Sequence, residues 1–131
     1  MSLKEIFSCY VSKTYTGDKQ AFDRIQQYFE DAGRYTEEQW KQKKADETEV
    51  VFAKGKSVAF TFDYQSPILE VRCIVEYSDE DGTITVGVGN SGFPFEAKWA
   101  KPRYQKLLNK IDAYIKEQGI DVKPIEQINA T

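Results

Sequence analysis

Histidine is absent from the 131 residues of this chain. Its absence excludes a Ser-His-Asp or Cys-His catalytic relay and removes the commonest side-chain ligand of zinc and iron. Cysteine is scarce as well, because the chain contains only Cys9 and Cys73, in unrelated contexts. A small secreted protein held together by disulfides uses more cysteines at regular spacings. We therefore expect reduced thiols, no metal, no cofactor and a cytoplasmic location.

Long apolar runs and a strong positive charge are also missing. No run approaches the roughly 18 residues of a membrane-spanning helix, and the N-terminus lacks the basic-then-apolar pattern of a signal peptide. The 18 Lys and Arg residues against 21 Asp and Glu residues give a net charge of -3. General nucleic-acid binding needs a basic surface. The composition therefore predicts a partner that is neither a membrane nor a nucleic acid.

Aromatic residues are abundant, with eight Phe, eight Tyr and two Trp making 14% of the chain. A chain of this length is typical of one domain, which we expect to span residues 1–131. A domain of this size buries about two thirds of its unfolded surface without a metal or a disulfide. The aromatic residues are the natural material for such a core.

Residues 3–15 carry apolar side chains at helical spacing, and Ser2 with Glu5 matches a capping box. This pattern predicts an N-terminal helix. The alternative is a strand, because the segment also contains four residues typical of strands: Tyr10, Val11, Thr14 and Tyr15.

Two more helices are predicted before residue 46. Asp18 is placed to cap a helix that Gly33 ends. Thr36 and Gln39 match a second capping box, which predicts a short polar helix through Trp40 that frays by Ala45.

From Glu49 the hydrophobic period changes from 3.6 to 2, which indicates strands. We predict four strands, joined by short turns, over residues 50–53, 58–64, 69–77 and 84–88. They form an antiparallel meander with one buried aromatic face and one face exposed to water.

The last quarter of the chain predicts a strand and a helix. Pro94 restricts residues 93–97 to an edge strand. Pro102 suits the first turn of a helix that Gly119 closes after Gln118. Residues 121–131 have no caps, so this tail either docks on the body or stays loose. The predicted fold is a two-layer α+β protein in which N-terminal helices and the C-terminal helix cover one face of a four- to five-stranded antiparallel sheet.

Gly87-Val88-Gly89-Asn90-Ser91-Gly92 matches the dinucleotide-binding string G-x-G-x-x-G after a predicted strand. The string binds a pyrophosphate only when a helix begins inside it and points its N-terminus at the phosphates. We expect Pro94 to block that helix. The string is therefore interpreted as a glycine-rich bend or bulge.

The face of the sheet that we expect to meet water carries the candidate partner-binding residues, which are polar: Thr61, Asp63, Glu70, Arg72 and Glu76. Three of them are carboxylates that would suit acid–base catalysis only if one lay in a dry pocket. Ion pairs between neighbouring strands explain the same pattern more simply.

The aromatic residues also admit a ligand cavity between the sheet and the helices. Its candidate lining is Phe52, Phe60, Phe62, Tyr64, Tyr77, Phe93, Phe95 and Trp99. The competing interpretation is that these side chains fill a close-packed core.

The sequence therefore favours a small non-enzymatic protein-interaction or regulatory module, which meets a protein partner or a second copy through a sheet face or edge strand. Size, acidity and the lack of a catalytic motif are typical of small immunity, antitoxin, chaperone-like or phage accessory proteins. The alternative is a small-molecule binder or enzyme that uses the aromatic cavity. That alternative requires a pocket of at least a few hundred cubic ångströms.

A chelator and a reductant test the expectations on metals and thiols. Neither histidine nor paired cysteines are available to hold a metal. We expect EDTA and dithiothreitol each to leave the melting temperature unchanged in differential scanning fluorimetry. A shift of several degrees with either reagent would contradict this interpretation.

Overall fold

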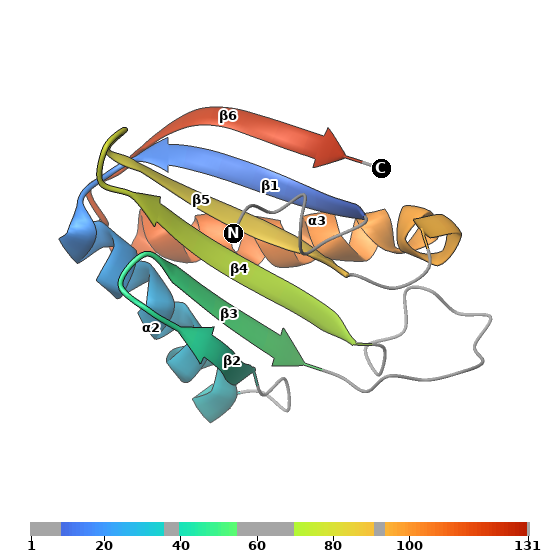
Figure 1. Ribbon diagram of the computed structural model, residues 1–131. Helices are drawn as coiled ribbons and strands as arrows, with labels where there is room; N and C mark the ends of the chain where they lie inside the picture. The colour runs from blue at the N-terminus through green and yellow to red at the C-terminus, as the bar shows by residue number, and fades with distance from the viewer. Residues whose placement is uncertain (1–8, 36–39, 55–69, 91–93, 131) are drawn as a thin grey trace.

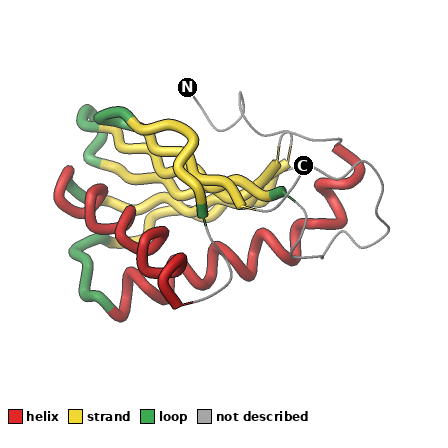
Figure 2. Tube along the Cα trace, turned by 90° about the horizontal axis from the view of Figure 1, so that it is seen from below, coloured by secondary structure: helices red, strands yellow, loops and turns green. Residues whose placement is uncertain are grey.

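The computed structural model describes residues 9–35, 40–54, 70–90 and 94–130. These residues form an α+β fold in which one six-stranded sheet has the order β2-β3-β4-β5-β1-β6 and every pair of neighbours is antiparallel (Figure 1). Both helices lie on the same side of the sheet (Figure 2). The elements are β1 (Cys9–Thr16), α2 (Lys19–Tyr35), β2 (Lys41–Ala45), β3 (Glu49–Lys54), β4 (Val71–Ser78), β5 (Thr83–Asn90), α3 (Pro94–Glu117) and β6 (Lys123–Ala130). The predicted fold class and the packing of the C-terminal helix on the sheet are confirmed.

The first element is the strand β1, so the predicted helix over residues 3–15 is wrong from Cys9 onward, and its earlier residues lie outside the described part. Tyr10 pairs with Gly89 of β5 on one side and with Ala130 of β6 on the other. A strand with two neighbours satisfies its backbone donors and acceptors on both edges. This pairing, together with the β-forming side chains, overrides the local helical signal.

The tail of the chain docks on the body as β6, which is one of the two outcomes that the sequence left open. It pairs with β1 from Lys123 to Ala130, with an irregularity opposite Thr14 and Tyr15. The two ends of the described chain therefore lie side by side in the sheet (Figure 1).

The segment Lys41–Ala45 is the edge strand β2, so the frayed end of the predicted short helix, from Trp40 to Ala45, is wrong there. Thr36 and Gln39, which suggested it, lie outside the described residues. β2 covers one edge of β3, whose six residues are all buried. Pairing with that apolar strand outweighs the modest helical preference of a lysine-rich segment, because a bare edge of β3 would leave buried backbone groups unpaired.

β3 pairs directly with β4, placing Phe52 opposite Cys73. The meander predicted from the sequence puts residues 58–64 between these two strands, so the predicted strand order is wrong at this point. The strand expected over residues 58–64 itself lies outside the described residues.

The sheet has a helix face, toward α2 and α3, and an outer face on its other side. Val71, Cys73 and Val75 are fully buried on the helix face, as predicted. The outer face is also buried at its centre, where Ile74 and Val51 lie, so the prediction of a water-exposed face is wrong there. Uninterrupted apolar runs are typical of strands covered on both faces.

The ends of α2 and α3 test the capping and terminating residues that were predicted from the sequence. Asp18 caps α2 as predicted, because its Oδ1 accepts a hydrogen bond of 2.9 Å from the backbone N–H of Ala21. The helix runs past Gly33 to Tyr35. Gly119 ends α3 as predicted, with a φ of 61° that favours glycine.

α3 begins at Pro94, so the predicted edge strand over residues 94–97 is wrong. A proline is well tolerated in the first turn of a helix, where its missing N–H has no partner to lose. Pro102 lies inside this helix. The loss of its hydrogen bond is offset by a buried apolar stripe: Tyr104, Leu107, Leu108, Ile111 and Ile115.

The stripe of α3 can be tested at its centre. Leu108 is 1% exposed, whereas Lys106 is exposed on the same helix. We expect Leu108→Ala to lower the free energy of unfolding by about 2–5 kcal/mol and Lys106→Ala by less than about 0.5 kcal/mol. Urea melts of the two variants measure both values. Small, equal effects would show that α3 does not hold the core.

Candidate functional site

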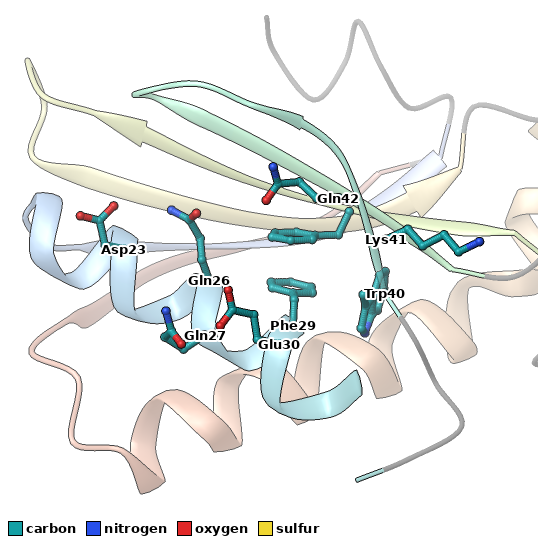
Figure 3. Close-up of a pocket in the computed structure, with 9 residues that line it drawn as sticks. Asp23, Gln26, Gln27, Phe29, Glu30, Trp40, Lys41 and Gln42 are labelled. Atoms are coloured by element: carbon teal, nitrogen blue, oxygen red, sulfur yellow. The ribbon is translucent and has the colours of Figure 1, made fainter. Parts of the chain in front are cut away.

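A groove of about 540 Å³ opens between α2 and the strands β2 and β3 (Figure 3). We call it the α2–β2 groove. Its helix wall consists of Asp23, Gln26, Gln27 and Glu30, and its strand wall of Trp40, Lys41 and Gln42. Phe29 lies between the two walls (Figure 3) and forms the floor together with Phe52, which stacks on it, and the ring of Trp40.

The floor of the groove is a packed aromatic cluster. The rings of Phe29 and Phe52 stack with centroids 4.0 Å apart and planes 6° apart, and Trp40 meets Phe29 edge-on at 5.3 Å. Aromatic pairs of this kind add about 0.5–1.5 kcal/mol beyond the burial of their area. Phe29, Phe52 and Trp40 are only 3%, 6% and 9% exposed. The cluster therefore joins α2 to the sheet and leaves little aromatic surface for a ligand.

The helix wall follows from the spacing of its residues. Asp23, Gln26, Gln27 and Glu30 stand at positions i, i+3, i+4 and i+7, which places them on one face of α2. Phe29, on the adjoining apolar face, reaches the sheet. The helix wall is thus the polar border of an amphipathic helix whose apolar side is committed to the core.

The strand wall is set by the register of β2 on β3. Gln42 pairs with Phe52, so both side chains stand on the helix face, and the register shifts between Gln42 and Lys44. The turn after β2 is held by Asp46, whose Oδ1 accepts hydrogen bonds of 2.9 and 2.8 Å from the backbone N–H groups of Thr48 and Glu49. The backbone hydrogen bond from Thr48 is the main cause that lowers the pKa of Asp46.

Several polar side chains along the groove have no hydrogen-bond or ion-pair partner among the described residues. Within the described ranges, the side chains of Gln27, Glu30, Lys41 and Gln42 make no hydrogen bond or ion pair. The Trp40 Nε1 is buried and has no acceptor there either. A buried N–H without a partner loses free energy relative to a hydrogen-bonded one. Gln27, Glu30 and Gln42 thus offer unused donors and acceptors along the groove, above a packed aromatic floor.

A second polar cluster joins α3 to β1. Asp112 accepts a hydrogen bond of 2.7 Å from the Tyr15 hydroxyl and one of 3.0 Å from Lys13 Nζ, and it pairs with Lys116 at 3.0 Å. Desolvation raises the pKa of Asp112, but the hydrogen bonds from Tyr15, Lys116 and Lys13 outweigh it, so the pKa lies below its usual value. Burial, reinforced by Asp112, raises the pKa of Tyr15. Because each group already has a partner, we interpret this cluster as an anchor of the helix and not as a site.

Two of the aromatic residues proposed as a cavity lining have described side chains, and both belong to the core or pack against it. Phe52 lies in the groove floor, whereas Tyr77 packs against Phe22 with centroids 5.7 Å apart. The others lie beyond what the structure describes, either in position or, within α3, in their side chains: Phe60, Phe62, Tyr64, Phe93, Phe95 and Trp99.

Three of the residues proposed as a partner-binding face fall within the described chain. Glu70 and Arg72 form an ion pair of 2.8 Å at the beginning of β4. Glu76 stands on the outer face and is partly buried. Thr61 and Asp63 lie outside the described residues, so the proposed face stays a prediction.

The first four residues of the glycine string, Gly87 to Asn90, form the end of strand β5. Gly87 pairs with Ile74 and Ser12, and Gly89 pairs with Arg72 and Tyr10, so both glycines lie within the sheet. Pro94 is the first residue of α3, so the helix begins beyond the last glycine of the string and not at Gly87–Asn90, which belong to β5. In the dinucleotide fingerprint the first two glycines shape the turn around the pyrophosphate. Here they are part of paired strands, which disfavours a nucleotide site.

Cys73 is a fully buried free thiol, and burial raises its pKa. Such a thiol behaves as a small apolar side chain. No group of three or more metal-ligating side chains occurs in the described ranges, and no helix there is long and apolar enough to span a membrane.

Comparisons of the chain with protein-family models and with curated proteins find no match. The function is therefore inferred only from the groove and its chemistry.

Most of the groove was missed by sequence reasoning, which named only Phe52. A usable signal existed in α2, where a polar stripe of carboxamides and carboxylates borders the apolar stripe that contains Phe29. A second signal was Trp40, an isolated aromatic residue before the lysine-rich segment 41–45. Neither signal reveals the groove without the pairing of β2 with β3, which brings the two segments together.

The anchor at Asp112 predicts a pH-dependent stability. We expect Asp112→Ala to lower the free energy of unfolding by about 1–3 kcal/mol at pH 7, because the buried Tyr15 hydroxyl loses its acceptor. The folded-state pKa of Asp112 is depressed, so its contribution is complete above its unfolded pKa of about 3.9 and is lost as the pH falls toward the folded value. Urea melts from pH 7 to pH 3 measure the difference.

The matched control is Tyr15→Phe, alone and combined with Asp112→Ala. The double variant is expected to lose less free energy of unfolding than the two single variants lose in total. Once the Tyr15 hydroxyl is gone, removing its acceptor Asp112 no longer leaves that hydroxyl unpaired. A wild-type advantage over Asp112→Ala that is the same at pH 3 and at pH 7 would contradict the ionic character of the anchor.

Proposed function

We propose that this protein is a non-enzymatic interaction module that binds an extended segment of a partner protein in the α2–β2 groove. The observation that carries the proposal is the set of unengaged polar side chains along both walls, with Gln27 and Glu30 on one side and Gln42 on the other. An extended peptide offers one donor and one acceptor per residue. Carboxamide side chains, which carry both a donor and an acceptor, match such a backbone.

The chemistry of the walls favours a peptide over a small apolar ligand. The volume of about 540 Å³ is in the range of small-molecule sites, which supports the competing function of a small-molecule binder. Such sites are mainly apolar with a few polar groups. Here six of the nine lining residues are polar or charged, and the aromatic floor is almost completely buried. An apolar ligand would gain little from this surface.

The groove is also a better docking place than either edge of the sheet. β2 is five residues long, contains Lys41, Lys43 and Lys44, and has an irregular register. β6 begins with Lys123 and Pro124, and its register shifts near Ile125. Short strands, lysines, prolines and bulges protect sheet edges from pairing with another chain. These features disfavour strand addition, including pairing with a second copy.

The cytoplasm is the proposed location, since a free, buried Cys73 suits a reducing compartment. An intracellular partner protein follows from this assignment.

A display selection tests the proposal. A random peptide library is selected on the full chain, and the dissociation constants of the recovered peptides are measured by isothermal titration calorimetry. Gln27→Trp places a large side chain in the groove from an exposed position of α2 and is expected to weaken binding at least tenfold, by steric exclusion. Recovered peptides that bind Gln27→Trp as tightly as the wild type would contradict the proposal, as would a selection that recovers none.

The matched control is Gln20→Trp, the same change at another exposed position of α2 that does not line the groove. We expect it to leave the dissociation constants within about twofold, as is usual for surface substitutions away from special features. Melting temperatures of both variants verify that the fold is intact.

A further inference from the structure

The helix wall of the α2–β2 groove is negatively charged. It carries two carboxylates, Asp23 and Glu30, which stand seven residues apart on α2. That separation is about 10 Å along the helix. The wall between them is formed by the uncharged carboxamides of Gln26 and Gln27 (Figure 3). A ligand that runs along α2 therefore passes two negative charges in succession.

The strand wall does not supply a positive charge to balance them. Gln42 pairs with Phe52 of the groove floor, whereas Lys41 pairs with Ala53, the next residue of β3. Successive side chains of a strand stand on opposite faces, so Gln42 faces the groove and the Lys41 side chain stands on the outer face of the sheet. Figure 3 shows Lys41 leading away from α2. The β2 side chain that faces the helix wall is therefore an uncharged one.

The carboxylates of the helix wall are largely available to a ligand. Asp23 has one long contact, 3.9 Å to Lys19, in which both side chains are exposed. Lys19 also donates a hydrogen bond to the backbone carbonyl of Glu47. Exposed ion pairs of this kind are weak and are screened by salt. Glu30 makes no ion pair with any residue that the structure describes.

The floor of the groove increases the effect of these charges. The rings of Phe29, Phe52 and Trp40 are packed together and buried, so the carboxylates stand beside a region of low dielectric constant. A cleft that combines charges of one sign with walls of low dielectric constant focuses the electric field and concentrates ligands of the opposite charge. The groove is thus complementary to positive charge.

Resting on the proposed peptide-binding function, we propose that the partner segment is basic, with Lys or Arg side chains directed at the helix wall. In this complex the carboxamides of Gln27 and Gln42 bind the backbone of the segment, and Asp23 and Glu30 select its side chains. Successive side chains of an extended segment point to opposite sides. The basic residues that face α2 therefore occupy alternate positions of the segment.

Three pools of synthetic heptapeptides test this charge preference on the full chain. All have capped ends, the same uncharged fluorophore and the same mixture of uncharged residues. They differ at the third and fifth positions, which are Lys in the first pool, Gln in the second and Glu in the third. Exposed ion pairs contribute about 0.2–1 kcal/mol each, so two of them predict about two- to thirtyfold tighter binding of the Lys pool than of the Gln pool by fluorescence polarisation. The Glu pool is expected to bind more weakly than the Gln pool.

Neutral variants separate the helix wall from the net charge of the chain. Asp23→Asn combined with Glu30→Gln keeps the size of both side chains and is expected to abolish most of the preference for the Lys pool. The matched control is Glu80→Gln combined with Glu117→Gln, which removes the same charge at two exposed positions outside the groove. We expect this control to keep the preference. A control that loses as much preference as the wall variant would assign it to the net charge of -3 and overturn the inference.

Salt provides a second measurement of the same property. Raising the NaCl concentration from about 0.1 M to about 1 M shortens the screening length from about 10 Å to about 3 Å. We expect the preference for the Lys pool to shrink in the wild type at the higher concentration, while the affinity for the Gln pool changes less. A preference that is unchanged at the higher concentration would overturn its electrostatic origin.

The failures of the two proposals are distinguishable. Equal binding of all three pools that Gln27→Trp abolishes would leave the groove as a peptide site and overturn its preference for basic segments. Binding of none of the pools, or binding that Gln27→Trp does not affect, would overturn the proposed function together with the preference.

Discussion

The structure depends on β1 being paired along both of its edges. Its partners, β5 and β6, come from the second half of the chain, so Tyr10 pairs with Gly89 and with Ala130. The strand also determines where α2 begins, because the chain passes close to the sheet at Gly17. A Cβ at this position would lie 2.8 Å from the Ile84 side chain, which no ordinary packing contact permits. Pairs so distant in sequence close large loops, which is slow in folding.

The two ends of the sheet have different roles. At the β1 end, α3 is fixed by its apolar stripe and by the hydrogen bond from Tyr15 to Asp112. At the other end, β2 has β3 as its neighbour in the sheet, and α2 is joined to the strands by the stack of Phe29 on Phe52. Polar side chains near the centre are used to hold the fold. Gln27, Glu30 and Gln42 of the α2–β2 groove make no such contacts within the described residues, which is why they remain available to a ligand.

The sequence predicted the features that local chemistry controls. The cap at Asp18, the glycine that ends α3, the buried alternation of β4 and the α+β class all follow from neighbouring residues. The errors at β1, β2 and the strand order share one cause, which is pairing between distant segments. The helical patterns in the sequence were overridden where β1 and β2 pair with other strands. The outer face of the sheet is buried at its centre, which the alternation of apolar and polar residues does not predict. The groove was missed for the same reason, since its two walls come together only through that pairing.

The aromatic cluster and the polar walls of the groove have separate roles in the proposed complex. Phe29, Phe52 and Trp40 are too deeply buried to supply much binding energy, but their stacking fixes the distance between the walls. A site whose geometry exists before binding avoids part of the ordering cost of association. The carboxylates of the helix wall then influence which way a segment lies more than how tightly it binds. Weak, oriented and readily reversed binding is what a regulatory contact requires, and it needs no catalytic group.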